Sequence, residues 1–408
     1  MTSTGTGPHG MPSTDIPDWR ERAARLREEL VATGKLWTPA WRAAVTDVPR
    51  HHFVPFFFER HPGAGWSLTS ADDQETRQRW LDAVYANRSL VTRLGVVPDG
   101  GRDRTGPTSS ASAPSLVTRM LEALDVRDGH RVLEIGTGTG YNAALLCHRL
   151  GDHGVHSVDI DPELVADARD RLAKLGYWPT LAHGDGAAGL PGHGHYDRII
   201  ATCAVTRVPW AWAEQTHDGG VVLVDVKAHA TVGNLALLHR LPDRLEGTFD
   251  AGTATFMQMR SSMPATSAAR SAVPRDRSAA RTRRAVQPDQ RLWENPPLWF
   301  QIHVREPGRI EFGFTQDPVT GDPADEFYTA RDGSWCELAT ASDGGSRYVH
   351  EGGPRSLWTS MEDTIGQWQD LGEPGWERLG LTVLSDSRQI VWVDHPDSEH
   401  RWTLPSGS

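Results

Sequence analysis

The chain has 408 residues, of which 38% are hydrophobic and 23% are charged, and its formal net charge is −11. A chain of this length allows about two domains, at roughly 150 residues each. No stretch approaches the roughly 20 apolar residues of a membrane helix, the N-terminus lacks the pattern of a secretory signal, and the acidic balance gives no basic footprint for nucleic acid.

The sequence holds three cysteines, Cys147, Cys203 and Cys336, which lie far apart and in no ligand spacing. This usage argues against a disulfide framework and a zinc site, and it favours a reducing compartment such as the cytoplasm. Histidines occur as the pairs 51–52 and 193/195, but no third ligand accompanies either pair. We therefore predict no metal site.

The N-terminal part is expected to be helical after a disordered lead-in at residues 1–14. Apolar residues at helical spacing and a glycine at position 34 predict a first helix from Trp19, and a second covers Ala40–Val45. Residues 59–107 carry turn signals at both ends and are interpreted as an elaborated loop region with one helix, ETRQRWLDAVYA.

From Pro114 onward, helix and strand patterns alternate. The predicted elements are helices at 116–124, 142–150 and 162–175 and strands at 131–135, 155–160, 197–202 and 221–226. Apolar strands that alternate with amphipathic helices indicate a parallel sheet covered on both faces.

The alternation stops after residue 226. Residues 230–260 read as antiparallel strands (NLALLHRL, GTATFMQMR), and 261–290 as a mobile basic linker poor in large apolar residues. In the domain at 291–408, WFQIHV, RIEFGFT, EFYTAR, SWCELAT and QIVWVDH read as strands and SLWTSMEDTIGQWQDLG as a helix. Eight of the 16 tryptophans lie beyond residue 290; they indicate either core packing or an aromatic peptide-binding surface.

A glycine loop, GTGTG, follows the first predicted strand and precedes a helix. Gly136, Gly138 and Gly140 permit a tight turn and close backbone approach, and the helix N-terminus offers amide donors to a ligand. The spacing alone is weak evidence, because nicotinamide enzymes use the same device.

Carboxylates at the ends of successive strands indicate which cofactor the glycine loop binds. Asp159 ends the next strand, where it can accept hydrogen bonds from ribose hydroxyls, and Asp185 follows the third strand within reach of an adenine amino group. Glu134 precedes the loop by two residues. These signals predict S-adenosyl-L-methionine as the cofactor and S-adenosyl-L-homocysteine as its product.

The predicted fold class is therefore α/β: a Rossmann-like class I S-adenosylmethionine methyltransferase domain at 15–260, with its cofactor core at 114–226, and a C-terminal β-rich α+β domain. The C-terminal domain is expected to bind substrate. The residues expected to bind the cofactor are Glu134, Gly136, Thr137, Gly138, Gly140, Tyr141, Asp159, Ile160, Asp185 and Gly186.

Several segments resemble the protein L-isoaspartyl O-methyltransferase family. They are VLEIGTGTGYNAALL, VDIDPELVADARDRLAKLGY, GDG and YDRIIATCAVTRVP, and, more specifically, DVPRHHFVP and SASAPSLVTRML. The resemblance covers about residues 40–260. It implies that Ser112 holds one oxygen of the substrate carboxylate, and that Ser110, Ala204 and Val205 bind substrate, the last two from a loop after IIAT.

The expected chemistry is methyl transfer to a carboxylate, which is ionised near neutral pH because its ordinary pKa is about 3.9, so that no general base is required. The family's repair enzymes usually carry threonine at the position of Ser110, and they lack the long insertion and the C-terminal half. WLDAVYANRSLVT and the Trp-rich tail resemble extended homologues associated with lanthipeptide and graspetide maturation.

That resemblance implies methylation of an aspartate in a cyclised precursor peptide, which then leads to aspartimide and isoaspartate. Two alternatives stay open. The chain could repair isoaspartate in damaged proteins, or it could be a catalytically silent peptide-binding module that retains the cofactor fold.

Overall fold

The computed structural model describes residues 16, 18–63, 65–99, 102–229, 232–260, 280–285, 291–306, 310–316, 319–320, 323–339 and 347–405. These residues form two compact units. The described part of the first unit runs over residues 16–203, 211–223 and 259–260, and the rest belongs to the second. The predicted lead-in at 1–14 lies outside the described residues.

The first unit begins with the two predicted helices, α1 (Trp19–Ala32) and α2 (Pro39–Asp47). A short helix that was not predicted, α3 (Arg50–Phe53), follows them. The buried positions of α1 are Ala23, Leu26 and Leu30, which is the apolar stripe that its sequence predicted. Gly34 follows the helix with a φ of 67°, a left-handed conformation that glycine adopts without strain.

The segment interpreted as a loop region forms a four-stranded antiparallel sheet, which corrects that prediction. Its order is β2-β1-β3-β4, and α4 (Arg77–Val84) is the helix that the sequence predicted. The strands are β1 (Phe56–His61), β2 (Gly65–Ser70), β3 (Leu90–Asp99) and β4 (Arg102–Ala111). The turn residues were recognised correctly, but they connect hairpin strands and do not mark an irregular loop.

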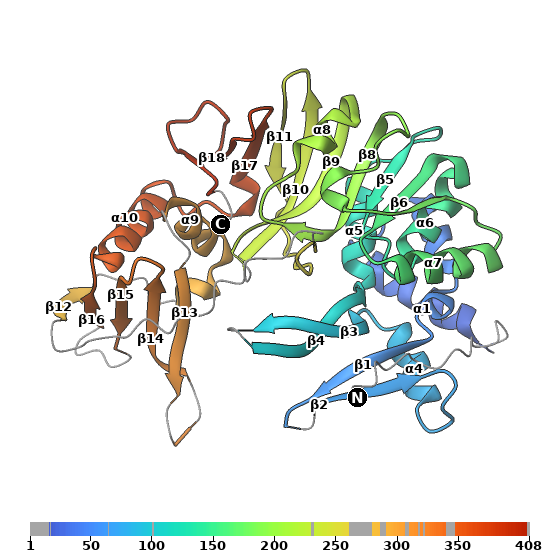
Figure 1. Ribbon diagram of the computed structural model, residues 1–408, viewed down its shortest axis with the longest axis horizontal. Coiled ribbons are helices and arrows are strands. Elements are labelled where there is room, and N and C mark those ends of the chain that lie inside the picture. The colour runs from blue at the N-terminus through green and yellow to red at the C-terminus, as the bar shows by residue number, and fades with distance from the viewer. Residues whose placement is uncertain are drawn as a thin grey trace. The chain divides into compact units, whose positions relative to one another are not determined.

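The α/β core follows in the predicted order. Its elements are α5 (Pro114–Ala123), β5 (Val132–Ile135), α6 (Tyr141–Leu150), β6 (Val155–Asp159), α7 (Pro162–Lys174), β7 (Thr180–His183), β8 (Tyr196–Val205), α8 (Trp210–Glu214) and β9 (Thr216–His229), with 3-10 helices at Asp152–Gly154 and Gly186–Ala188. The strand order is β9-β8-β5-β6-β7, and β8, β5, β6 and β7 are parallel neighbours (Figure 1). The parallel sheet confirms the prediction.

The second unit contains an antiparallel set of strands in the order β19-β18-β17-β11-β10-β9. Its strands are β10 (Val232–Leu241), β11 (Arg244–Phe249), β17 (Leu379–Leu384), β18 (Gln389–Val393) and β19 (Arg401–Thr403). The sequence analysis placed the residues of β10 and β11 in the methyltransferase domain at 15–260. In the structure both strands lie in the second unit, where β11 pairs with β17. GTATFMQMR, expected as a strand, makes only an isolated bridge from Gln258 to Ala204.

A further antiparallel sheet of the second unit has the order β12-β16-β15-β14-β13. The strands and the accompanying helices are β12 (Arg281–Ala285), α9 (Pro296–Arg305), β13 (Ile310–Gln316), β14 (Pro323–Ala330), β15 (Trp335–Leu338), β16 (Arg347–Gly352) and α10 (Leu357–Asp370), with 3-10 helices at Leu292–Glu294 and Trp376–Arg378. Residues 281–285 of the predicted linker are thus a strand paired with β16, while 261–279 and 286–290 lie outside the described residues.

WFQIHV was predicted as a strand and is instead part of α9. The Asn295 side chain caps this helix by accepting a hydrogen bond from the Leu298 amide at 3.2 Å, and two prolines occupy its first positions. A short apolar run does not distinguish a buried helix from a buried strand.

The tryptophans beyond residue 290 serve mainly as core. Six of those eight side chains are at most 6% exposed, namely Trp299, Trp335, Trp358, Trp368, Trp376 and Trp392. Among the described residues, no helix is long and apolar enough to cross a membrane.

Candidate cofactor and carboxylate site

The glycine loop lies at the carboxyl end of β5, where parallel sheets bind ligands. Gly136, Gly138 and Gly140 all have positive φ values, of 98°, 52° and 89°. A Cβ on Gly136 would lie 2.8 Å from Thr202 Oγ1, and one on Gly140 would lie 3.0 Å from the Cβ of Ala168. Glycine is therefore required for both backbone conformation and space, as the sequence predicted.

Asp159 joins the end of β6 to this loop. Its Oδ2 accepts a hydrogen bond from the Gly138 amide at 2.9 Å, and its Oδ1 accepts one from the Asp161 amide at 3.0 Å. A carboxylate offers about four lone-pair positions, so two acceptor positions stay available for hydroxyl groups of a ligand. The side chain is 8% exposed. This geometry suits the predicted ribose contact, with Ile160 next to it, half-buried.

Asp185 and Gly186 lie just beyond β7. The Asp185 carboxylate caps a 3-10 helix by accepting a hydrogen bond from the Ala187 amide at 2.9 Å. Gly186 is buried, and a Cβ there would lie 2.6 Å from Ile135 Cγ2. Its carbonyl accepts a hydrogen bond from the Trp212 indole at 2.8 Å. The Asp185 side chain is half-buried, next to the end of β5 where an adenine amino group is expected.

Glu134 and Thr137 lie behind the loop. The Glu134 side chain is fully buried and accepts hydrogen bonds from Asn142 Nδ2 at 2.8 Å and Ser157 Oγ at 2.6 Å. Burial raises its pKa to about 7. The Thr137 hydroxyl is 2.7 Å from Ser157 Oγ and is also buried. These contacts indicate that both side chains support the loop from the protein interior. A direct contact between Glu134 and the cofactor stays a prediction, and the complete burial of the Glu134 side chain disfavours it.

The Ser112 segment is fixed by Arg50, a residue to which sequence reasoning assigned no role. Arg50 is 1% exposed; its guanidinium donates to the carbonyl of Ser112 at 2.9 Å and to that of Val84 at 2.5 Å. Burial lowers its pKa to about 10. The same guanidinium lies 5.8 Å from the ring centroid of Tyr141, the first residue of α6. Arg50 thus links the Ser112 segment to the helix that follows the glycine loop. The signal that could have revealed the role of Arg50 is its place in DVPRHHFVP, where a charged residue stands close to apolar ones.

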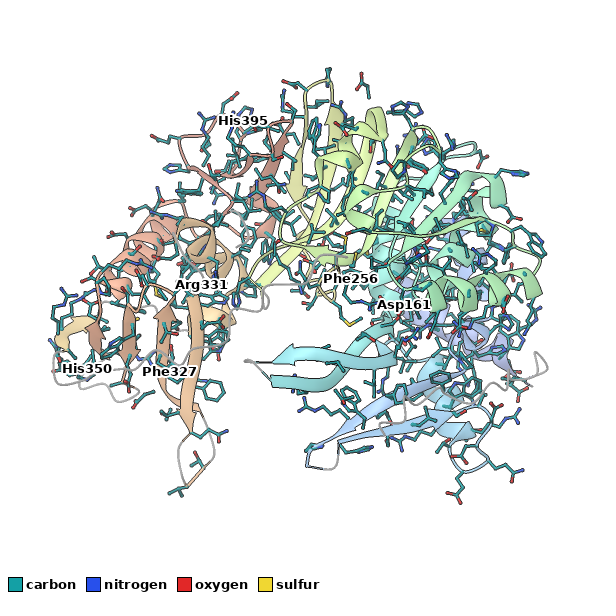
Figure 2. All side chains as sticks on the ribbon, viewed as in Figure 1. Asp161, Phe256, Phe327, Arg331, His350 and His395 are labelled. Atoms are coloured by element: carbon teal, nitrogen blue, oxygen red, sulfur yellow. The ribbon has the colours of Figure 1, made fainter. Side chains whose placement is uncertain are left out.

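The hairpin of β3 and β4 also contacts the loop region. A Cβ on Gly138 would lie 3.9 Å from Ser109 Oγ, and Ser109 is 4% exposed. Arg93 of β3 forms an ion pair with Asp161 at 3.2 Å and a second with Glu163, at the start of α7. Asp161, marked in Figure 2, also caps α7 through the amides of Glu163 and Leu164. These contacts bring the strand that carries Ser110 beside the glycine loop.

Ser112 itself is half-buried, between β4 and α5. Within the described part of the chain, no group hydrogen-bonds its hydroxyl, which is therefore available to a ligand. Ser110 is also half-buried, and it lies two residues earlier, near the end of β4.

Ala204 and Val205 do not lie in a loop, which corrects the prediction. Both belong to β8 and are at most 2% exposed, and the Ala204 amide donates to the Met257 carbonyl at 2.8 Å. The sequence signal was misleading because β8 continues past the apolar run IIAT. Their proposed contact with substrate stays a prediction.

The candidate metal ligands have other partners. His51 Nδ1 is 2.7 Å from the Tyr85 hydroxyl, and His52 Nε2 is 2.9 Å from the Arg171 carbonyl. Burial lowers the pKa of both imidazoles, that of His51 to about 4. Among the described residues, no group of three or more His, Cys, Asp or Glu side chains could hold a metal ion.

The parallel sheet, the left-handed glycine turn and the carboxylates at the ends of β6 and β7 define a Rossmann-like class I methyltransferase. Comparison with known proteins identifies the family. A profile described as "Protein-L-isoaspartate(D-aspartate) O-methyltransferase (PCMT)" matches residues 101–250. The chain is 30% identical over 244 residues to the protein-L-isoaspartate O-methyltransferase of Aeropyrum pernix, an alignment that covers 59% of this chain and 80% of that protein. The chain therefore belongs to the protein-L-isoaspartate O-methyltransferase family.

The matched share of other relatives varies. Identity with the protein-L-isoaspartate O-methyltransferase of Ignicoccus hospitalis is 43% over 124 residues, which covers 30% of this chain and 59% of that protein. A solved protein-L-isoaspartate O-methyltransferase superposes with a TM-score of 0.49 at 20% identity and covers 91% of this chain and 100% of its own. The chain spans 59% and 61% of the first two relatives that it matches.

The cofactor of this family of methyltransferases is S-adenosylmethionine, and the residues at the site fit it. The left-handed turn at Gly136, Gly138 and Gly140 presents a backbone without side chains at the end of β5, and Asp159 and Asp185 supply acceptors where ribose hydroxyls and an adenine amino group would lie.

Proposed function

We propose that this chain is an S-adenosylmethionine-dependent carboxyl O-methyltransferase that methylates the side-chain carboxylate of an aspartyl residue in a peptide. The observation that carries the proposal is the Arg50 contact, because it holds the carbonyl of Ser112 and lies near Tyr141 beside the glycine loop. This contact supports the proposal that the Ser112 hydroxyl holds the substrate carboxylate near the region that fits the cofactor.

When bound, the cofactor would supply an electrophilic methyl group from its sulfonium sulfur, with S-adenosylhomocysteine as the leaving group. The substrate carboxylate is already ionised near neutral pH, so the chain has no proton to remove. Ser112 donates a hydrogen bond to one carboxylate oxygen and leaves the other free to form the bond to the methyl carbon. The protein's contribution is therefore alignment and exclusion of water.

The preferred substrate is a cyclised ribosomal precursor peptide, whose aspartate is converted through its methyl ester to aspartimide and isoaspartate. Support comes from the parts of the chain that lie outside the profile match at 101–250, which include α1–α4, β1–β3 and the described residues beyond 250. A general repair enzyme needs to recognise little besides the damaged residue, whereas a dedicated enzyme needs further surface for its peptide. We also propose that the second unit binds this peptide.

Repair of isoaspartate in damaged proteins is the second candidate function. It is favoured by the similarity to protein-L-isoaspartate O-methyltransferases. In either case we propose a cytoplasmic location, because Cys147, Cys203 and Cys336 are not in disulfide bonds.

Methyl transfer to two peptides separates these candidates. One is a linear isoaspartyl peptide and the other a cyclised peptide that contains an unmodified aspartate. Turnover of the cyclised peptide at least ten times faster supports the tailoring function. Efficient turnover of the linear peptide without such a preference would reject it in favour of repair, and binding of S-adenosylmethionine without turnover of either would indicate a silent module.

Ser112→Ala tests the role of the serine. We expect the affinity for S-adenosylhomocysteine, measured by calorimetry, to stay nearly unchanged, since the variant alters no residue of the glycine turn. Turnover should fall at least ten-fold, because the loss of one hydrogen bond to a charged group costs roughly 1.5–3 kcal/mol. Ser115→Ala is the matched control, because Ser115 is a half-buried serine three residues further on, in the first turn of α5. Equal turnover by wild type and Ser112→Ala would remove Ser112 from this role.

A further inference from the structure

The four-stranded sheet of the first unit has one buried face. Phe57 opposes Thr69 on β1 and β2, and Leu90 opposes Ala111 on β3 and β4. Directly opposed residues point to the same face. All four side chains are at most 5% exposed, so this face is packed against the core.

On the other face, three neighbouring apolar residues are not fully buried. Phe58 opposes both Leu68 and Val91, and Val91 opposes Ser110. These four side chains, three of them apolar and the last a serine, form one row across the sheet, which we call the apolar row. Leu68 is 40% exposed, and the other three are half-buried. The ring of Phe56 lies next to that of Phe58, with 5.9 Å between the ring centroids.

This composition is unusual for the solvent side of an antiparallel sheet, which normally alternates to polar residues. Exposed apolar side chains that lie next to one another mark a binding surface more often than isolated ones do. The apolar row is therefore a candidate binding surface for a ligand.

The position of the row identifies that ligand. The row ends at Ser110, two residues before Ser112. Ser109, the neighbour of Ser110 on β4, lies near the glycine loop, since a Cβ on Gly138 would lie 3.9 Å from Ser109 Oγ. One strand thus contributes to both the cofactor region and the apolar row. The row is continuous with the carboxylate site, and its four side chains are far fewer than the roughly 20–30 residues a side of a stable protein interface.

We propose that the apolar row binds an apolar or aromatic side chain of the peptide whose aspartate is held at Ser112, an inference that rests on the proposed function. Ser110 and Ser112 are two residues apart, which corresponds to about 7 Å along a strand. Leu68 lies three strands from Ser110, a distance of about 14 Å across the sheet. At about 3.3 Å per residue, an extended peptide brings a side chain two to five positions from the aspartate over this row.

The test uses two fluorescein-labelled, lactam-cyclised peptides that each contain one aspartate and differ only in Phe or Ser three positions away from it. Binding to the full chain is measured by anisotropy with S-adenosylhomocysteine present. The wild type should bind the Phe peptide roughly ten-fold more tightly, as expected for burial of one aromatic side chain. Leu68→Glu should remove this preference. Because Leu68 is 40% exposed, the variant should still fold.

Val96→Glu is the matched control: Val96 is 70% exposed on β3, outside the apolar row, and its variant should keep the preference. Val91→Thr, which is nearly isosteric, should reduce the preference without a charge. Equal binding of the two peptides by the wild type, no binding of either up to millimolar concentration, or an unchanged preference in Leu68→Glu would overturn the inference.

Methyl transfer to the same two peptides tests the proposed function separately. Discrimination in binding without methyl transfer would reject that function and support the apolar row as a binding surface. Methyl transfer without discrimination would reject the row and leave the function in place.

Discussion

Arg50 shows how a single buried side chain can determine the geometry of a site that it does not line. Its guanidinium is held by carbonyls from three segments, those of Val84, Arg88 and Ser112. The planar fork of an arginine can serve several acceptors at once, whereas the ammonium group of lysine is a point donor. Arg50 is therefore a positioning residue for Ser112.

We expect Arg50→Lys to lower kcat at least ten-fold with little change in the affinity for S-adenosylhomocysteine, because the carbonyl of Ser112 loses its partner while the glycine turn keeps its own contacts. Steady-state kinetics and calorimetry measure the two quantities. Arg198→Lys is the control: Arg198 is also buried and donates to carbonyls, those of Leu124 and Asp125, but from the start of β8. If both variants lose stability and kcat to the same extent, Arg50 has only a structural role.

Glu134 predicts a pH dependence of stability. Its pKa rises from the ordinary 4.5 to about 7 in the folded chain, mainly because burial disfavours the charged form. A carboxyl that holds its proton more tightly when folded stabilises the fold below its unfolded pKa, and this contribution is lost as the pH rises through about 7. Glu134→Gln cannot titrate, so it should not lose this stability.

We expect the free energies of unfolding of the cofactor-free wild type and Glu134→Gln to be similar near pH 4.5 and to diverge by about 3 kcal/mol, in favour of the variant, by pH 8. Urea unfolding at several pH values measures this. A difference that does not change with pH would show that the pKa of Glu134 is not raised.

At the scale of single elements, strand pairing in the second unit depends on one close approach. Gly380 of β17 lies opposite Trp392 of β18, and a Cβ on Gly380 would lie 2.1 Å from the indole ring. The ring has no room to retreat, since Trp392 is 4% exposed and its Nε1 donates to Thr382 Oγ1 at 3.1 Å.

Gly380→Ala should therefore destabilise the chain by about 1–3 kcal/mol, as overpacking of a core does. Gly366→Ala should have the opposite effect. Gly366 lies inside α10, and a Cβ there would have no neighbour within 4 Å. Alanine should therefore stabilise this helix by about 0.5–1 kcal/mol. Thermal unfolding of both variants measures these effects. A stable Gly380→Ala variant would mean that the β17–β18 pairing adjusts easily.

The elements that the sequence predicted correctly are those with local signals. The helix α7 shows its boundaries through Asp161 and Pro162, and the glycine turn shows its position by residue type alone. The strands β1–β4 and the helix α9 were predicted incorrectly, because hairpin pairing and the buried surroundings of an apolar run depend on partners distant in sequence. The same reason hid the role of Arg50, whose acceptors lie 34 to 62 residues away.

At the scale of the whole molecule, the division of the chain determines which pieces can fold alone. The sequence predicted a methyltransferase domain that ends at residue 260 and is followed by a linker. In the structure, β11 hydrogen-bonds β17 over five residue pairs, and Phe249 contacts the rings of Phe300 and Trp376 at 5.2 and 5.5 Å. A chain cut at 260 would lose these partners and would expose an unpaired strand edge.

We therefore expect residues 1–260 alone to aggregate or to unfold at a lower temperature than the full chain, even though the glycine turn, Asp159 and Asp185 are all present. Size-exclusion chromatography and thermal unfolding, with and without S-adenosylhomocysteine, measure this. A chain that ends at 405 is the control, because every described partner of β11 is retained. A monomeric 1–260 with full cofactor affinity and cooperative unfolding would show instead that the boundary predicted from the sequence is a true domain boundary, and that β17 contributes nothing essential to β11.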